Sequence, residues 1–84
     1  MDIQEINSQL QIVKLDNARF RHQQGYVVVS GYTFKHPELG YVAFDCDNGK
    51  PYIPIGGRLA LESILEQGGF VSFDRMSFVQ EYTA

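Results

Sequence analysis

Cysteine, tryptophan and proline are scarce in this chain of 84 residues, which contains one Cys, no Trp and three Pro. A single cysteine excludes an intramolecular disulfide and any metal site built from several cysteines. Without tryptophan, the large apolar side chains of a core must come from the six Phe and five Tyr residues. The lone Cys46 favours a reducing compartment, so we expect a cytoplasmic protein.

The sequence also lacks a long apolar run and an excess of positive charge. No stretch approaches the ~20 apolar residues that span a bilayer, and residues 1–5 have neither the basic nor the apolar part of a signal peptide. Seven Lys and Arg residues stand against ten Asp and Glu residues, which gives a net charge of −3. We therefore expect a soluble protein without membrane association, and nucleic acid is disfavoured as a partner.

Hydrophobic residues make up 44% of the chain and charged residues 20%, which is typical of globular proteins. No linker or repeat interrupts the sequence, so residues 1–84 are interpreted as a single domain. Apolar residues spaced three and four apart predict a short helix after Asp2, which is suited to be its N-cap. The same spacing predicts a second helix from Arg58 to Gln67, ended by Gly68-Gly69.

Most of the remaining sequence is typical of strands. The clearest strand runs from Gly25 to Phe34, where both alternating faces are apolar, which indicates a central position. Alternation from Gln11 to Phe20 slips by one residue across Asp16-Asn17, which indicates a bulge or two short strands. A last strand segment, Phe70 to about Tyr82, slips in the same way at Asp74-Arg75.

Asn48-Gly49 follows a predicted strand, Tyr41 to Cys46, and predicts a two-residue type I′ hairpin turn. This turn pairs Cys46 with Pro51, Phe44 with Ile53 and Val42 with Ile55, so these side chains share one apolar face. The opposite face then holds Tyr41, Ala43, Asp45 and Tyr52. In this register Cys46 is a buried small hydrophobic residue rather than a nucleophile.

The order of these elements predicts an α+β fold. Most connections are too short for crossovers, so the sheet is expected to be mostly antiparallel. It is either strongly curved or closed into a small partial barrel, with a short N-terminal helix and one helix, about 58–67, before the last strand. The sequence does not decide between these two shapes.

No motif of catalysis or cofactor binding is present. Nucleophile elbows, P-loops and dinucleotide-binding glycine patterns are all missing. His22 and His36 have no helical histidine partner, and the segment from Asp45 to Gly49 has its glycine one position too early for a calcium loop. We therefore predict a protein that is not an enzyme, with no catalytic residues, no metal site and no cofactor.

One weak anion site is predicted at Gly56, Gly57 and Arg58. Free N–H groups, the helix dipole and a guanidinium group meet there if the second helix begins at this point. A glycine pair at a corner between a strand and a helix also has an ordinary geometric explanation.

Tyrosines are numerous for a domain of this size. Each has an apolar ring and a polar tip, the chemistry that is enriched at protein interfaces. Our leading hypothesis is a non-enzymatic binding module whose tyrosine-rich sheet face pairs with a second copy, as a homodimer, or with another protein. The candidate contact residues are Tyr26, Tyr32, Tyr41 and Tyr52.

Two other hypotheses remain open. Basic residues interleaved with aromatics in the first half of the chain fit an OB-like or SH3-like partial barrel that binds single-stranded nucleic acid. The candidate contacts are Arg19, Arg21, His22, Lys35 and His36 with Tyr26, Tyr32 and Phe34. The third hypothesis is a small-ligand pocket between sheet and helix, with Arg58, His36 or Arg75 as polar contacts.

Overall fold

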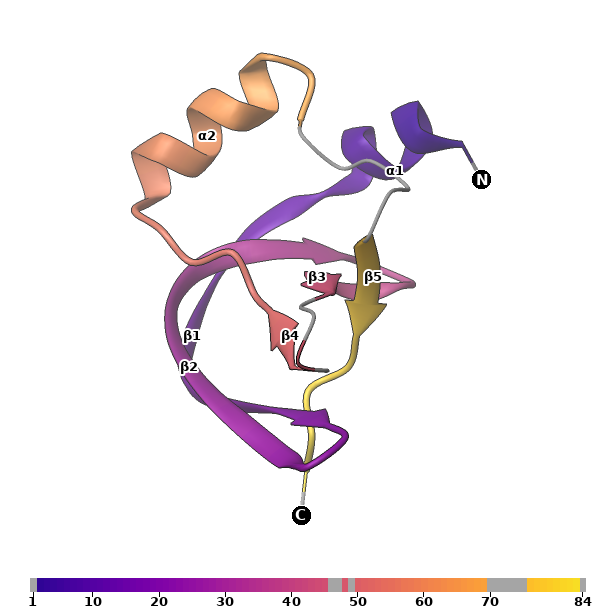
Figure 1. Cartoon of the computed structure of the whole chain (residues 1–84). Coiled ribbons are helices and arrows are strands. Elements are labelled where there is room, and N and C mark those ends of the chain that lie inside the picture. Colours follow the sequence, from indigo (N-terminus) through magenta and orange to yellow (C-terminus); the bar gives the residue numbers. More distant parts are fainter. Residues whose placement is uncertain (1, 46–47, 49, 70–75, 84) are drawn as a thin grey trace.

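A computed structural model describes residues 2–45, 48, 50–69 and 76–83 of the chain (Figure 1). The elements are α1 (Ile3–Gln9), β1 (Gln11–His22), β2 (Gly25–His36), β3 (Gly40–Asp45), β4 (Pro51–Tyr52), α2 (Arg58–Glu66) and β5 (Met76–Val79). The five strands form one sheet in which every ladder is antiparallel. The predicted α+β class, with a short first helix and one later helix, is confirmed.

The sheet has the order β1-β2-β3-β4, and β5 pairs with the other edge of β3. Tyr41 of β3 shows this arrangement, because it pairs with Lys35 of β2 on one side and Val79 of β5 on the other. β1 and β2 form a long bent hairpin that wraps around the shorter strands (Figure 1). One isolated bridge, between Phe20 and Glu81, joins the segment after β5 to β1, and the ladders otherwise leave the sheet open.

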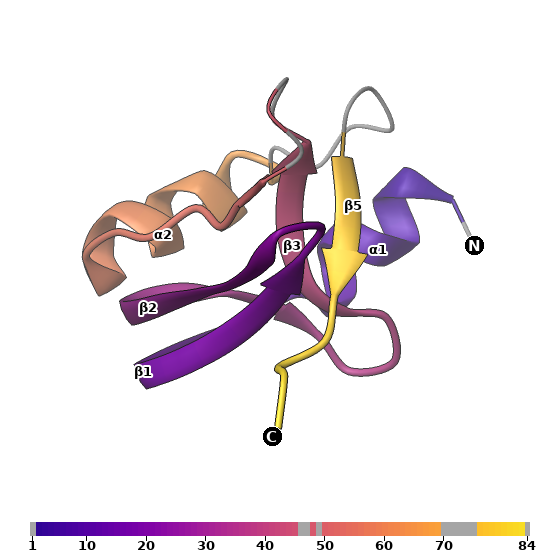
Figure 2. The same cartoon turned by 60° about the horizontal axis from the view of Figure 1, so that its bottom comes forward.

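Both helices form where the sequence predicts them. Asp2 caps α1, since its carboxylate accepts a hydrogen bond from the Glu5 N–H at 2.8 Å. Gly57 is the N-cap of α2, which ends one residue before the predicted boundary. In Figure 2, α1 and α2 lie on either side of the paired strands β3 and β5.

The phase slip in β1 is a β-bulge. The register between β1 and β2 shifts between Leu15 and Ala18, and Asn17 has a φ of 53°. Ser30 Oγ holds the bulge from the facing strand, because it accepts a hydrogen bond from the Asn17 N–H at 2.9 Å. The extra residue turns the side chains over, which keeps Leu15 and Ala18 on the same buried face. The predicted slip at positions 74–75 lies outside the described residues.

Around β3 the sheet carries a buried cluster on each of its two faces. Under the helices lies a cluster of Ile6, Leu10, Phe34, Val42 and Leu61. On the opposite face lies a second cluster of Leu15, Ala18, Phe20, Tyr41, Ala43 and Ile53. Because Val42 belongs to the first cluster and its neighbour Ala43 to the second, β3 forms the wall between the two cores.

This double burial explains why the predicted hairpin register is wrong. Asp45 pairs with Pro51 and Phe44 pairs with Tyr52, so positions 46–50 lie between paired residues instead of a two-residue turn. Tyr52 consequently shares a face with Phe44, whereas Ile53 packs with Ala43 on the other face. The prediction placed Ile53 on the face of Val42 and Phe44, but the opposite face of β3 is also buried, and Ile53 belongs to the core on that side. Cys46 lies outside the described residues, so its predicted burial remains a prediction.

None of the helices within the described ranges is both long and apolar enough to cross a membrane.

Tyr41 makes the free energy of unfolding depend on pH in the alkaline range. Burial raises the pKa of its phenol above the ordinary value of 10.0, and the negative charge of Glu81 raises it further. The unfolded chain therefore loses this proton at lower pH than the folded protein. The stabilisation is present below about pH 10 and is lost as pH rises through the folded-state pKa.

We expect the Tyr41→Phe variant to lose this dependence, so that its free energy of unfolding falls less steeply above about pH 10 than that of the wild type. Urea unfolding across the alkaline range measures the difference. Tyr52→Phe, which removes a hydroxyl from a side chain that is 56% exposed, is the matched control. Identical alkaline slopes for Tyr41→Phe and the wild type would contradict the assignment.

Candidate functional site

The four tyrosines predicted as an interface do not form one surface. Tyr41 is only 8% exposed and meets Phe20 edge to face, with 5.0 Å between ring centroids. Tyr32 is half-buried against the core under the helices. Tyr26 and Tyr52 are exposed, but they lie on different strands with no contact between them. Tyr41 is therefore corrected from an interface residue to a core residue, because it lies in the second buried cluster.

The structure instead brings two tyrosines and two arginines together on one exposed face. Tyr26 and Tyr82 stack with ring centroids 6.3 Å apart and an interplanar angle of 26°. The Arg19 guanidinium carbon lies 5.3 Å from the Tyr26 ring centroid, and that of Arg21 lies 4.4 Å from the Tyr82 centroid. We call these four residues the Arg-Tyr array.

Strand geometry explains why these side chains meet. Arg19 and Arg21 are two residues apart on β1, so they point to the same side, while Phe20 between them enters the core. Tyr26 pairs directly with Arg21 across the β1-β2 ladder. On the other edge of β1, the Tyr82 N–H donates to the Arg19 carbonyl at 2.6 Å, which places its ring beside the same arginines. Three neighbouring segments therefore build the array.

The array carries positive charge that has no ion-pair partner in the described part of the chain. Within the described part of the chain, the one ion pair is Arg58 with Glu62, at 2.9 Å on α2. Arg19 and Arg21 have no carboxylate within ion-pair distance in that part. Each guanidinium lies within cation–π distance of a tyrosine ring and has no ion-pair partner among the described residues, so its N–H donors can bond to a carboxylate or phosphate.

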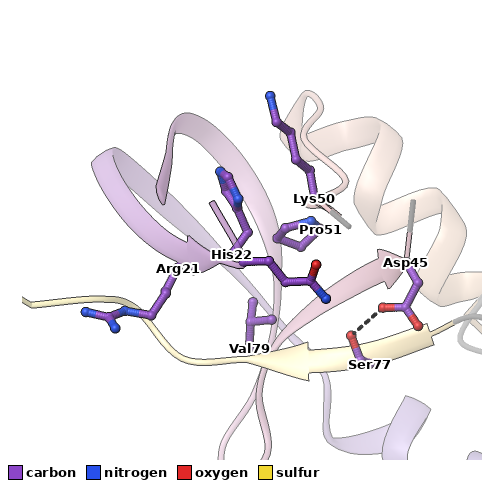
Figure 3. A pocket seen from close by; sticks show the side chains of 8 residues that line it. Arg21, His22, Asp45, Lys50, Pro51, Ser77 and Val79 are labelled. Carbon is purple, nitrogen blue, oxygen red and sulfur yellow. Dashed lines mark hydrogen bonds between the residues drawn. The ribbon is translucent and has the colours of Figure 1, made fainter. Parts of the chain in front are cut away.

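Two shallow hollows flank the hairpin turn beside the array. One, of about 250 Å³, is lined by Arg21, His22, Gln23, Gly25, Tyr26 and Tyr82. The other, of about 420 Å³, is lined by Arg21, His22, Gln23, Asp45, Lys50, Pro51, Ser77 and Val79. Figure 3 shows Arg21 turned away from the other labelled side chains of this second hollow.

The larger hollow contains polar side chains but no assembled catalytic pair. The Ser77 hydroxyl donates to the Asp45 carboxylate at 3.3 Å, and so it is not paired with a histidine (Figure 3). His22 Nδ1 accepts from the Gln24 backbone N–H at 3.1 Å. No group of three His, Cys, Asp or Glu residues suited to a metal ion occurs among the residues that the structure describes. The arrangement provides hydrogen bonds and charge for binding.

The basic cluster predicted from sequence is divided among three environments. Arg19 and Arg21 belong to the array, and His22 faces the hollows. Lys35 lies on the other face, with its ammonium 5.3 Å from the Tyr41 ring centroid. His36 is completely buried. Arg75, a candidate pocket contact, lies outside the described residues.

At the predicted anion site at the start of α2, two of the expected groups have other partners. The Gly56 N–H donates to the Tyr32 carbonyl at 3.1 Å and so is not available to an anion. The Arg58 guanidinium is paired with Glu62. Gly57 is the N-cap of α2, and its carbonyl accepts the first helical hydrogen bond, from Leu61. These contacts support the geometric explanation of the glycine pair.

Comparison of the chain with family models, curated proteins and solved structures gives no match.

The sequence did not single out two residues of this face. Tyr82 shares the interface chemistry of the other tyrosines but was not among the four candidate contact residues. Apolar residues on both faces of the strand from Gly25 to Phe34 predicted a central strand, whereas Val28 is 51% exposed. The alternation of Arg19, Phe20 and Arg21 around a buried centre was the available signal, since it predicts two arginines on one face. Nothing local connects Tyr82 with that face, because the contact depends on the path of the chain after β5.

Proposed function

We propose that this protein is a non-enzymatic binding module that holds an acidic segment of another protein against the Arg-Tyr array. The observation that carries the proposal is the array itself: two exposed guanidinium groups that have no ion-pair partner in the described residues and are held by stacked tyrosine rings. Arginine and tyrosine, together with tryptophan, are enriched at the energetic centres of protein interfaces.

The preorganisation of the arginines favours binding. A free arginine side chain loses rotamer entropy when it is fixed in a complex, at a cost of about 0.5–1.5 kcal/mol. Tyr26 and Tyr82 restrict Arg19 and Arg21 before any partner arrives, so part of that cost is met during folding. A carboxylate can then accept charge-assisted hydrogen bonds from a guanidinium edge that is already in place.

Charge favours a protein partner over a nucleic acid. The net charge of −3 repels a polyanion at long range, whereas a short acidic segment meets mainly the local positive charge. A nucleic-acid strand presents a phosphate at every nucleotide and needs a continuous basic track. The array offers two arginines, with Glu81 adjacent in sequence to Tyr82, and Lys35 is on the other face.

Selection from a phage-displayed library of random peptides tests this proposal. We expect the selected peptides to be enriched in Asp and Glu, and to bind the Arg19→Gln/Arg21→Gln variant at least about tenfold more weakly than the wild type, because each lost charge-assisted hydrogen bond contributes about 1.5–3 kcal/mol. Fluorescence anisotropy with the labelled peptides measures the affinities. Binding should weaken as salt rises.

Arg58→Gln is the control, because it makes the same Arg-to-Gln change, with the loss of one positive charge, on an exposed side chain outside the array. It should leave peptide affinity within about twofold of the wild type. Peptides without acidic enrichment, or equal affinity for wild type and double variant, would refute the proposal. Tight binding of a labelled single-stranded oligonucleotide at low salt, lost in the double variant, would assign the array to nucleic acid instead.

A further inference from the structure

We infer that the acidic segment binds as an additional β-strand along the free edge of β2 at residues 26–30. This inference rests on the proposed function and specifies how the partner is held. It follows from the pairing of β2, the direction of its backbone groups and the position of the array.

Among the described residues, one edge of β2 has no paired strand in the half that follows the β1-β2 turn. On one side, β2 pairs with β1 along its length. On the other side, it pairs with β3 at Lys35 and His36 and receives the Gly56 N–H at Tyr32. Within the described residues, positions 26–30 have no strand neighbour on that side. In Figure 1 these positions lie in the lower part of the bent hairpin.

The backbone polar groups of this edge point outward. The Arg19 carbonyl accepts from Tyr82, so the polar groups of Arg19 are directed away from β2. Arg19 and its partner Val28 are therefore a non-hydrogen-bonded pair of the antiparallel ladder. It follows that the N–H and C=O of Val28 point to the free edge, as do those of Tyr26 two residues away. An incoming strand can bond to all four groups.

This edge lacks two common protections against strand addition, a charged side chain and a proline. Natural edges are blocked by lysine, proline, inward charges or very short strands. Residues 26–30 are Tyr-Val-Val-Val-Ser, with no charge and no proline. Tyr26 and Val28 are 50% and 51% exposed, so their side chains add apolar area beside the open backbone groups.

The array explains why the added strand should be acidic. Neighbouring strands are spaced by about 4.8 Å, so an added strand lies about 10 Å from β1. A glutamate side chain on the added strand and an arginine side chain on β1 can reach each other over this distance, above Tyr26 and Val28 of β2. A second copy of this chain added antiparallel along the same edge would bring two arrays to one face and collect four guanidinium groups, so charge disfavours self-pairing.

Blocking the free edge tests the inference. The probe is the tightest peptide from the phage selection, labelled with fluorescein. We expect Val28→Pro to weaken its binding at least about tenfold, because proline removes a donor and adds a ring at the edge. Val28→Thr, which keeps the N–H, should stay within about threefold. Proline is tolerated at this position because the Val28 N–H makes no bond to β1, and circular dichroism checks that both variants are folded.

N-methylated versions of the same peptide give a test that leaves the protein unchanged. Two peptides are compared, one methylated at the odd-numbered backbone nitrogens and one at the even-numbered nitrogens. One of the two should lose binding and the other should keep it, because only every second residue of an added strand bonds to β2. Binding that depends on the arginines but resists both Val28→Pro and N-methylation would overturn the added strand and leave the proposed function standing. A selection that yields no acidic peptide would overturn both the inference and the proposed function. Light scattering that shows a dimer of the wild type, abolished by Val28→Pro, would overturn the inference alone.

Discussion

Gly40→Ala is expected to lower the free energy of unfolding by about 3–5 kcal/mol. Gly40 begins β3 with a φ of +105°, a conformation that an alanine rarely adopts. A β-carbon at this position would lie 2.6 Å from the Val79 carbonyl oxygen and 2.6 Å from Gln80 Nε2. The carbonyl belongs to the backbone of β5, so it cannot move away without disturbing the β3-β5 ladder. Urea unfolding followed by circular dichroism measures the change.

Two other glycines separate the causes of this effect. Gly25→Ala places a β-carbon in open space at a φ of +145°, so it isolates the backbone strain and should cost about 1–2 kcal/mol. Gly57→Ala has neither strain nor a close neighbour and should change stability by less than about 1 kcal/mol. If Gly40→Ala proves no worse than Gly25→Ala, the close approach of β5 is not the cause.

His36→Ala should destabilise the protein by about 3–4 kcal/mol. The ring is completely buried, and its edge packs against Phe78 with centroids 5.9 Å apart. Nδ1 accepts the backbone N–H groups of Glu38 and Leu39, each at 3.1 Å, and so closes the turn between β2 and β3. Alanine removes the ring volume and leaves two donors of the turn without their acceptor. Thermal or urea unfolding measures the loss.

His36→Asn distinguishes the turn from the packing. An asparagine carbonyl can accept from the N–H groups two and three residues ahead, as it does in many turns. We therefore expect this variant to be at least about 1 kcal/mol more stable than His36→Ala. Equal stability of the two variants would show that the ring packing, and not the hydrogen bonds, accounts for the effect. A loss below about 1 kcal/mol for His36→Ala would contradict both contributions.

Local signals in the sequence were sufficient for the helices and for the position of the irregularity in β1, although they left open whether it is a bulge or a break between two short strands. Asp2 and the apolar spacing in the residues directly after it specify α1. The phase slip at Asp16-Asn17 marks the irregularity in β1, because side-chain alternation in a strand is strict. These features depend on neighbours that are close in sequence. They are therefore available before any tertiary contact is known.

The register of β4 and the membership of the array depend on distant segments and could not be derived in this way. Ile53 packs with Ala43 in the second core, on the face of β3 opposite the one to which the predicted register assigned it. The turn residues Asn48-Gly49 favour a tight hairpin, but burial of both faces of β3 overrides that preference. Tyr82 joins Arg21 only because the chain passes beside β1 after β5. Charge and aromatic content pointed to binding, whereas topology decides which residues meet.

The contact of Tyr82 with β1 couples binding to the attachment of the segment that follows β5. Tyr82 contributes both a backbone hydrogen bond to Arg19 and a ring under Arg21. If docking of this segment on β1 raises the affinity for a ligand by some factor, then binding of that ligand must raise the equilibrium constant for docking by the same factor. Protection of the Tyr82 amide from hydrogen exchange should accordingly increase when the surface is occupied.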